Sequence, residues 1–166
     1  MRVLLQRVTQ ASVIVAGENA GEIGRGLLLL MAIAPDDTDV DLERMASKIA
    51  NLRIFEDDAG KMNRSALDEI GDGGDPAFGL LVVSQFTLYA DLRKGRRPSF
   101  TGAAAPDVAA PMIERWAKML AALGFRVERG VFGAHMAVHL VNDGPVTLWL
   151  DSADLRPATS DTREGR

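Results

Sequence analysis

Three stretches of the sequence combine residue types that could do chemistry. SQFTLYAD (84–91) brings hydroxyl and amide groups to the end of an apolar run, and RKGRR (93–97) places four cations within five residues. NDGP (142–145) lies where two further apolar runs meet. Polar groups and free backbone at a strand end are common site material, and Arg and Lys pair well with phosphate oxygens. The first stretch therefore suggests a reaction site and the second a phosphate contact.

Each stretch also has an ordinary interpretation. SQFTLYAD could be a strand whose Gln85, Thr87 and Tyr89 face water, and RKGRR could be a solvated loop. Asn, Asp, Gly and Pro all favour turns, so NDGP could be a plain turn. Its alternative is a backbone held in an unusual shape for a ligand.

Metal and cofactor chemistry find no support in the sequence. His135 and His139 are the only histidines, and in a strand they would lie roughly 13 Å apart, too far for one metal. We expect two ordinary, partly buried histidines. The chain has no cysteine, which excludes disulfides and zinc-thiolate sites, and neither a dinucleotide fingerprint nor a P-loop is present. We expect no metal and no cofactor.

Bulk composition is that of a soluble globular protein. The 166 residues are 47% hydrophobic and 25% charged, which fits one domain with a sizeable core. MRVLLQRVTQ does not resemble a signal peptide, and the apolar run at 27–34 is far shorter than a membrane helix. We expect a cytoplasmic protein without a membrane segment. Because the net charge is −4, contact with nucleic acid must come from a local patch.

Apolar and β-branched runs predict the strands. Residues 2–8 and 11–17 are interpreted as a strand pair joined near Thr9 and Gln10, and the continuous run 27–34 as a strand buried on both faces. Further strand signals cover residues 80–91, 125–132, 138–141 and 146–150.

Periodic apolar positions predict two helices. Thr38 and Asp41 form a potential capping box for the first, which should end near residues 52–53. The second follows Pro106, with Asp107 as a plausible cap and Gly124 as its stop. The loop 71–79 offers almost nothing to bury, and residues 153–166 are expected to be a disordered tail.

This order of elements predicts an α/β (mixed α+β) fold. We expect a single compact domain, 1–152, with a mostly antiparallel or mixed sheet and two packed helices.

Taken together, the three stretches resemble the D-aminoacyl-tRNA deacylase family. The resemblance covers residues 1 to about 152, and two features depart from it: a longer insert at 69–79 and the extra tail. The matching motifs are QRV (6–8), GEIGRGLLLL (21–30), NLRIFEDDAGKMNRS (51–65), SQFTLYAD (84–91), RKGRRPSF (93–100), FGAHM (132–136) and NDGPVT (142–147).

The resemblance implies hydrolysis of the ester that joins a D-amino acid to the 3′ end of tRNA. It implies a deacylase-like fold, a homodimer with the active site at the interface, and tRNA as partner. It also implies a cis bond between Gly144 and Pro145 that enters the partner's site and rejects L-amino acids by shape. Glycine has no side chain to reject, so we expect glycyl-tRNA to be cleaved as well.

The resemblance assigns further roles by position. The N–H groups of Phe86 and Thr87 would stabilise an oxyanion, while Ser84 and Gln85 shape the pocket. Thr87 is either a nucleophile or a positioning residue. A threonine nucleophile needs a neighbouring base, and none is adjacent in sequence, so we favour attack by water helped by the ribose 2′-OH.

Other matched positions would bind the substrate. Phe132 and Met136 would lie near the amino group and the terminal adenosine, or belong to the core, and Arg7 would brace the Gly-Pro segment. The acceptor-stem phosphates would be held by Arg93, Lys94, Arg96 and Arg97. Two other classes compete: a nucleic-acid-binding module without catalysis, and a dimeric structural protein.

Overall fold

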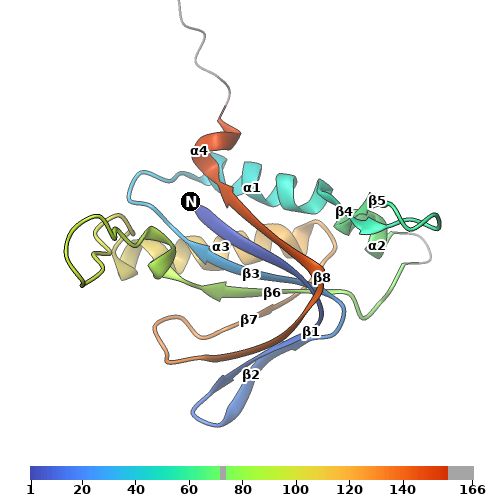
Figure 1. Cartoon of the computed structure of the whole chain (residues 1–166), viewed down its shortest axis with the longest axis horizontal. Coiled ribbons are helices and arrows are strands. Elements are labelled where there is room, and N and C mark those ends of the chain that lie inside the picture. Colours follow the sequence, from blue (N-terminus) through green and yellow to red (C-terminus); the bar gives the residue numbers. More distant parts are fainter. Residues whose placement is uncertain (72–73, 157–166) are drawn as a thin grey trace, which may run out of the picture.

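A mixed sheet forms the centre of the molecule. The structure, a computed structural model, describes residues 1–71 and 74–156 (Figure 1). The sheet has the strand order β2-β1-β3-β6-β7, and β8 pairs with β1. Its strands are β1 (Arg2–Val15), β2 (Glu18–Ile23), β3 (Gly26–Ala32), β6 (Gly79–Ser84), β7 (Arg126–Arg129) and β8 (Ala137–Asp151). The predicted mixed α/β fold is confirmed.

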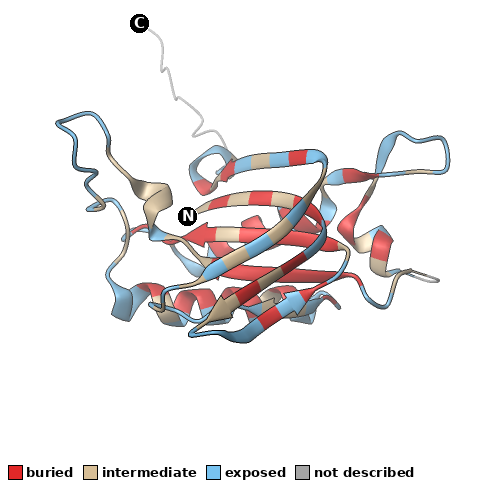
Figure 2. Cartoon of the chain, turned by 60° about the horizontal axis from the view of Figure 1, so that its bottom comes forward, coloured by how far each residue is buried: buried red, intermediate tan, exposed pale blue. Residues whose placement is uncertain are grey.

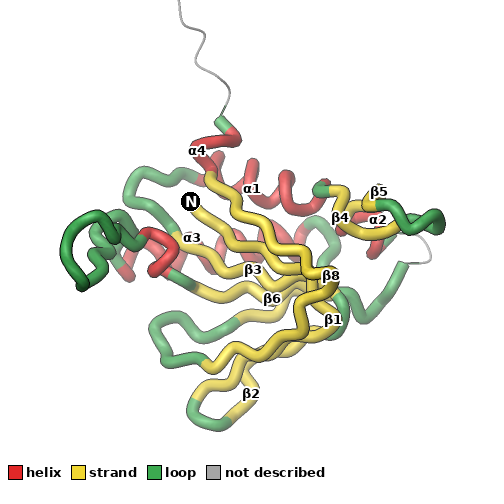
Figure 3. Tube along the Cα trace, in the orientation of Figure 1, coloured by secondary structure: helices red, strands yellow, loops and turns green. Residues whose placement is uncertain are grey.

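Helices and a small hairpin complete the domain (Figure 3). The two long helices are α1 (Asp39–Asn51) and α3 (Pro106–Ala122). The shorter elements are the strands β4 (Arg53–Glu56) and β5 (Met62–Ser65), the helices α2 (Ala66–Ile70) and α4 (Ser152–Leu155), and the 3₁₀ helix η1 (Phe86–Tyr89). No helix in the described ranges is long and apolar enough to cross a membrane.

β1 is one bent strand, so the predicted turn near Thr9 and Gln10 is wrong. Its first half pairs with β3 and its second half with β2, while β8 follows it on the other side. The register with β8 shifts between Val8 and Gln10, which is where a bulge lets the strand bend. Both apolar halves were correctly predicted as strands, and the bend takes them into two different clusters of buried residues.

The two clusters bury β3 on both faces, as predicted. One cluster joins β3 to α1 and α3, with Trp116 fully buried and its Nε1 donating to the Leu42 carbonyl at 3.2 Å. The second lies where the outer half of β1, β2 and part of β8 fold over β3 and β6. Figure 2 shows the alternation of buried and exposed residues along the outer strands.

Capping hydrogen bonds and the backbone preferences of proline and glycine set the ends of the two long helices. The Thr38–Asp41 capping box is present, with the Thr38 N–H donating to the Asp41 carboxylate at 2.9 Å. At α3 the cap residue is Ala105, so the prediction of Asp107 as cap is wrong; Pro106 occupies the first turn and Asp107 follows it. Gly124 follows the end of α3 with φ +99°, a conformation that glycine adopts without strain.

Two expectations about loops need correction. Phe78 in the 71–79 segment is 1% exposed and packs edge-on against Phe55 at 5.3 Å, so this segment does contribute to the core. The chain after Ser152 continues into α4, which contradicts disorder for residues 153–155. Ser152 also accepts a hydrogen bond from the buried Met1 amine, which pairs with Asp37. The rest of the expected tail, 157–166, lies outside the described residues.

Candidate active site

A pocket of about 410 Å³ opens at the carboxyl ends of the parallel strands β3 and β6. Met31 and Ser84 are register partners at this edge of the sheet. The loop at 100–106, the first turns of α3, and Phe132 with Gly133 complete the walls. Ligands commonly bind outside the carboxyl ends of parallel strands. Ser84, Gln85, Phe86 and Phe132 from the predicted site all line this pocket.

The chain leaves the sheet at Ser84 and turns into η1, so a strand through residue 91 was wrong. The Gln85 N–H donates to the Met31 carbonyl at 2.7 Å, and the first bond inside η1 runs from the Leu88 N–H to the Gln85 carbonyl. The N–H groups of Phe86 and Thr87 precede that bond. Within the described part of the chain, neither has a hydrogen-bond acceptor. Two adjacent backbone donors are therefore available at the edge of the pocket.

The Thr87 hydroxyl is held by an amide. Gln85 Nε2 donates to Thr87 Oγ1 at 2.5 Å. An amide donor does not take a proton from the hydroxyl, whereas an activated nucleophile needs a base. Phe86 beside it is 58% exposed, with its ring edge-on to Phe100 at 5.1 Å.

Phe132 and Met136 occupy different surroundings. Phe132 is 41% exposed on the pocket wall, as a ligand-contacting residue would be. Met136 packs partly buried against the second core cluster and lies outside the pocket lining. For Met136, the alternative of a core residue fits the structure of the single chain.

Gly144 and Pro145 form an exposed bulge within β8. Gln6 lies opposite Thr147 and Val8 opposite Asn142, so β8 carries extra residues here and continues in the same direction. The segment is therefore not a turn between two strands. The Gly144–Pro145 peptide bond is cis. Asn142 Nδ2 closes the base of the bulge by donating to the Arg7 and Val146 carbonyls.

Arg7 lies beneath this bulge and is 5% exposed. Its Nη1 donates to the Ile54 carbonyl at 2.5 Å, and its Nε is 2.9 Å from the Asp143 carboxylate. Nε has no hydrogen bond despite this distance, so Asp143 acts on it through charge more than through a directed bond. A Cβ on Gly144 would lie 3.0 Å from Arg7 Nη2, which shows how closely the bulge rests on Arg7.

Within one chain the pocket and the bulge lie apart. Ser84 is next to Met31 at the end of β3, whereas Arg7 pairs with Leu27 near its start. Four residues along a strand correspond to roughly 13 Å. In Figure 1 η1 lies to the left of the sheet and the bend of β8 to the right. One chain does not bring these two predicted parts of the site together.

The basic stretch forms an exposed loop beside η1. A bridge between Asp91 and Ser99 closes it, and Arg93 pairs with Asp91 at 2.7 Å. The hydrogen bond from the Arg93 side chain lowers the pKa of the Asp91 carboxyl to about 2. Lys94, Arg96 and Arg97 are exposed, and no acidic partner lies against them in the described residues. Of the four predicted phosphate contacts, Arg93 is thus already paired with a carboxylate.

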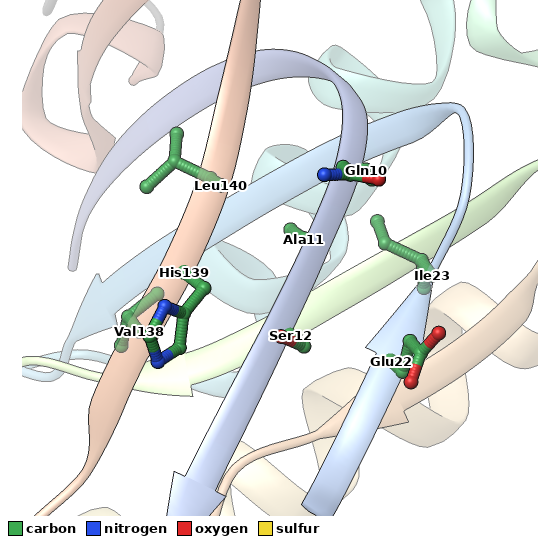
Figure 4. Close-up of a pocket in the computed structure, with 8 residues that line it drawn as sticks. All are labelled: Gln10, Ala11, Ser12, Glu22, Ile23, Val138, His139 and Leu140. Carbon is green, nitrogen blue, oxygen red and sulfur yellow. The ribbon is translucent and has the colours of Figure 1, made fainter.

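A larger hollow of about 570 Å³ crosses β2, β1 and β8 and contains none of the predicted site residues (Figure 4). Ser12 lies opposite both Glu22 and His139 there. His135 and His139 are exposed, not partly buried as expected. No cluster of potential metal ligands occurs in the described residues.

Sequence reasoning missed Phe100 and Asn142 as parts of the site. Phe100 touches Phe86 and lines the pocket, and Asn142 fixes the bulge. Both lie inside stretches that were singled out. The signal was an aromatic residue ending RKGRRPSF and an amide beginning NDGPVT.

Comparison with known proteins identifies close relatives. The family model described as D-Tyr-tRNA(Tyr) deacylase matches residues 4–151. A D-aminoacyl-tRNA deacylase of Thermomicrobium roseum is 59% identical over 161 residues, which are 97% of this chain and 100% of the relative. One from Thermotoga petrophila is 52% identical over 155 residues, covering 93% of this chain and 99% of the relative.

Two solved structures have folds similar to that of this chain. The c-Myc DNA unwinding element binding protein is 41% identical with a TM-score of 0.81, covering 91% of this chain and 98% of that one. A probable eukaryotic D-amino acid tRNA deacylase has a TM-score of 0.75 at 22% identity, over 90% and 97% of the two chains. This second likeness concerns the fold.

Proposed function

The chain belongs to the D-Tyr-tRNA(Tyr) deacylase family, and from that premise we propose that it hydrolyses the ester bond of D-aminoacyl-tRNA. The products are free tRNA and the D-amino acid. The reaction removes D-amino acids from mischarged tRNA, which is a form of translational proofreading. The corresponding location of the protein would be the cytoplasm.

The observation that carries the proposal is the pair of free N–H groups of Phe86 and Thr87 at the pocket edge. An aminoacyl ester is already activated, so its hydrolysis mainly requires stabilisation of the negative oxygen that forms at the carbonyl. Fixed backbone donors supply this, and each is worth roughly 10²–10³ in rate. Ser84 and Gln85 fix the start of η1 and shape the pocket around these donors.

Thr87 acts as a positioning residue in this mechanism. Its hydroxyl is held by Gln85, and no base lies within hydrogen-bond distance of it in the described part of the chain. Water attacks the ester, helped by the ribose 2′-OH of the substrate. Thr87→Ala should therefore keep substantial turnover, measured as tRNA deacylation in single-turnover conditions. Abolished turnover with intact binding would instead make Thr87 the nucleophile.

Rejection of L-amino acids is the role of Gly144 and Pro145. Both are exposed and held by Arg7, Asp143 and Asn142, so their main chain can form a rigid wall in a neighbouring site. An L side chain would meet this wall and a D side chain would point away from it. Glycyl-tRNA carries no side chain and should be cleaved too.

The separation of pocket and bulge in one chain supports a homodimer. If both belong to one site, the bulge must come from a second copy, which places the active site at the interface. β8 also carries Val141 and Trp149, each about half exposed, and a partner subunit would cover such apolar side chains.

The tRNA would lie along the basic loop. Lys94, Arg96 and Arg97 would hold acceptor-stem phosphates, with Arg93 contributing less because of Asp91. Phe132 would contact the amino acid or the terminal adenosine at the pocket wall. Met136 would reach the adenosine only through a shift of its side chain away from the core.

A chiral hydrolysis assay tests the function. Purified protein is incubated with D-Tyr-tRNA and, in parallel, with L-Tyr-tRNA, and the remaining aminoacyl-tRNA is measured over time. We expect D-Tyr-tRNA to be cleared at enzyme concentrations that leave L-Tyr-tRNA intact. Binding of both without hydrolysis would favour a nucleic-acid-binding module, and equal hydrolysis would remove the role of the bulge.

A further inference from the structure

Arg2 lies outside the motifs that carry the family resemblance and was expected only as a strand residue, yet its side chain reaches η1. Its Nη1 donates to the Leu88 carbonyl at 2.9 Å, and its guanidinium lies 4.3 Å from the centre of the Tyr89 ring. Leu88 and Tyr89 are the last two residues of η1. The first two, Phe86 and Thr87, carry the free N–H groups.

Arg2 is itself firmly held. Its backbone is in β1, paired with Ala32 of β3 on one side and Asp151 of β8 on the other. Its Nε donates to the Asp151 carboxylate at 2.9 Å, and the Trp149 ring lies 5.5 Å away. The side chain thus extends from the middle of the sheet to the end of η1. A cation beside the last carbonyls of a helix is also favoured electrostatically.

η1 needs such support because it is short. Its two ends are closed by hydrogen bonds from the Leu88 N–H to the Gln85 carbonyl and from the Ala90 N–H to the Thr87 carbonyl. Its start is tied to β3 through Gln85 and Met31. In the described residues, Arg2 is the one side chain that donates to a carbonyl of η1. Without Arg2 the end of η1 loses this hydrogen bond to the sheet.

We propose that Arg2 is a positioning residue for ester hydrolysis, which fixes η1 so that the N–H groups of Phe86 and Thr87 meet the oxyanion. The inference rests on the proposed function. Arg2 contacts Leu88 and Tyr89, not the donors, so it acts through the placement of η1. Donors must lie about 2.7–3.1 Å from the oxyanion, and a misplacement of about 1 Å can cost roughly 10²-fold in rate.

Three variants separate positioning from general stability. Arg2→Met keeps an apolar stem but loses the donor, and Arg2→Lys keeps a donor and the charge. Arg115→Met is the matched control, because Arg115 on α3 pairs with Asp39 on α1 at 3.1 Å and is not among the residues that line the pocket. We expect kcat on D-Tyr-tRNA to fall about tenfold to hundredfold in Arg2→Met, with KM little changed. Arg2→Lys should recover at least a third of the lost rate, and Arg115→Met should stay within twofold of the wild type.

Amide hydrogen exchange gives a second readout that needs no catalysis. The amides of Leu88 and Ala90 should exchange faster in Arg2→Met than in the wild type, with the core amide of Trp116 unchanged and Arg115→Met unaffected. If Arg2→Met does not fold, Arg2→Gln replaces it.

The two readouts keep the hypotheses apart. A wild type that fails to hydrolyse D-Tyr-tRNA would sink the proposed function, and exchange at Leu88 and Ala90 would still decide whether Arg2 holds η1. An active wild type with unchanged kcat in folded Arg2→Met would overturn the positioning role alone. Unchanged exchange, or equal losses in Arg2→Met and Arg115→Met, would overturn it too.

Discussion

Replacing Phe86 by proline removes one backbone donor together with the aromatic ring. Phe86 is the first residue of η1, where proline is tolerated because no N–H at this position closes a helical bond. Gln85 before it has φ −146° and ψ 72°, outside the helical region that proline disfavours in its predecessor. Phe86→Ala is the matched control, since it loses the same ring contact with Phe100 but keeps the N–H.

The expected magnitude follows from the role of the donor. Both variants lose the ring, so the ratio of their kcat values measures the contribution of the Phe86 N–H alone. Loss of one of two oxyanion donors should lower kcat of Phe86→Pro about 10²–10³-fold relative to Phe86→Ala, or about 2.7–4 kcal/mol. KM should be similar in the two variants, because the oxyanion forms in the transition state and is absent from the bound substrate.

Single-turnover deacylation of D-Tyr-tRNA at saturating enzyme measures this ratio directly. Thermal unfolding of both variants shows whether the fold is intact. If folded Phe86→Pro is within tenfold of Phe86→Ala, the N–H of Phe86 does not stabilise the oxyanion and the proposed mechanism is wrong.

Three further predictions concern charged groups around the site. Asp143→Asn should cost about 1–2 kcal/mol in urea unfolding at fixed protein concentration, because the buried Arg7 guanidinium loses a countercharge that is itself 40% exposed. In an Arg7→Met background the same change should cost at most about 0.5 kcal/mol, and additive losses would contradict the pairing. Arg96→Ala should reduce the salt slope of tRNA binding by about 1, and Arg93→Ala by less than half of that, with D/L discrimination unchanged; equal slopes would show that Arg93 is free. Because Arg93 depresses the pKa of Asp91 to about 2, the pair is intact above the ordinary value of 3.8 and is lost as the pH falls towards 2. An NMR titration of Asp91 should show this midpoint, and Arg93→Ala should move it back towards 3.8.

Much of the fold could be predicted because local chemistry decides it. The Thr38–Asp41 capping box, the run buried as β3 and the stop at Gly124 each depend on neighbours in the sequence, and each is confirmed. The continuity of β1 could not be predicted, since two paired strands and one bent strand share the same alternation. What decides between them is pairing with β2, β3 and β8, which lie far away in the chain.

The candidate site was predictable in its parts but not in their arrangement. Polar groups follow the apolar run of β6 as expected, yet the turn of SQFT into η1 depends on the bond between Gln85 and Met31, a contact between distant segments. The contact of Arg2 with η1 likewise cannot be predicted from the sequence, because 86 positions separate Arg2 from Leu88, the residue whose carbonyl it binds. The separation of the pocket from Gly144 also emerges only from the register of the sheet.

The central claim is that one active site combines the pocket of one chain with the bulge of another, and mixed dimers test it most directly. Phe86→Pro disables the pocket. Gly144→Ala disables the bulge, because a Cβ there meets Arg7 and Val146 at 3.0 Å in a backbone with φ +113°. Each variant alone should be nearly inactive on D-Tyr-tRNA: Phe86→Pro lacks an oxyanion donor, and in Gly144→Ala a bulge pushed off Arg7 would protrude into the neighbouring pocket and block the substrate. After subunit exchange in an equal mixture, half of the dimers are mixed and each has one intact site, so activity should return to about one quarter of the wild type. A mixture that stays as inactive as its components would contradict a site shared between two chains.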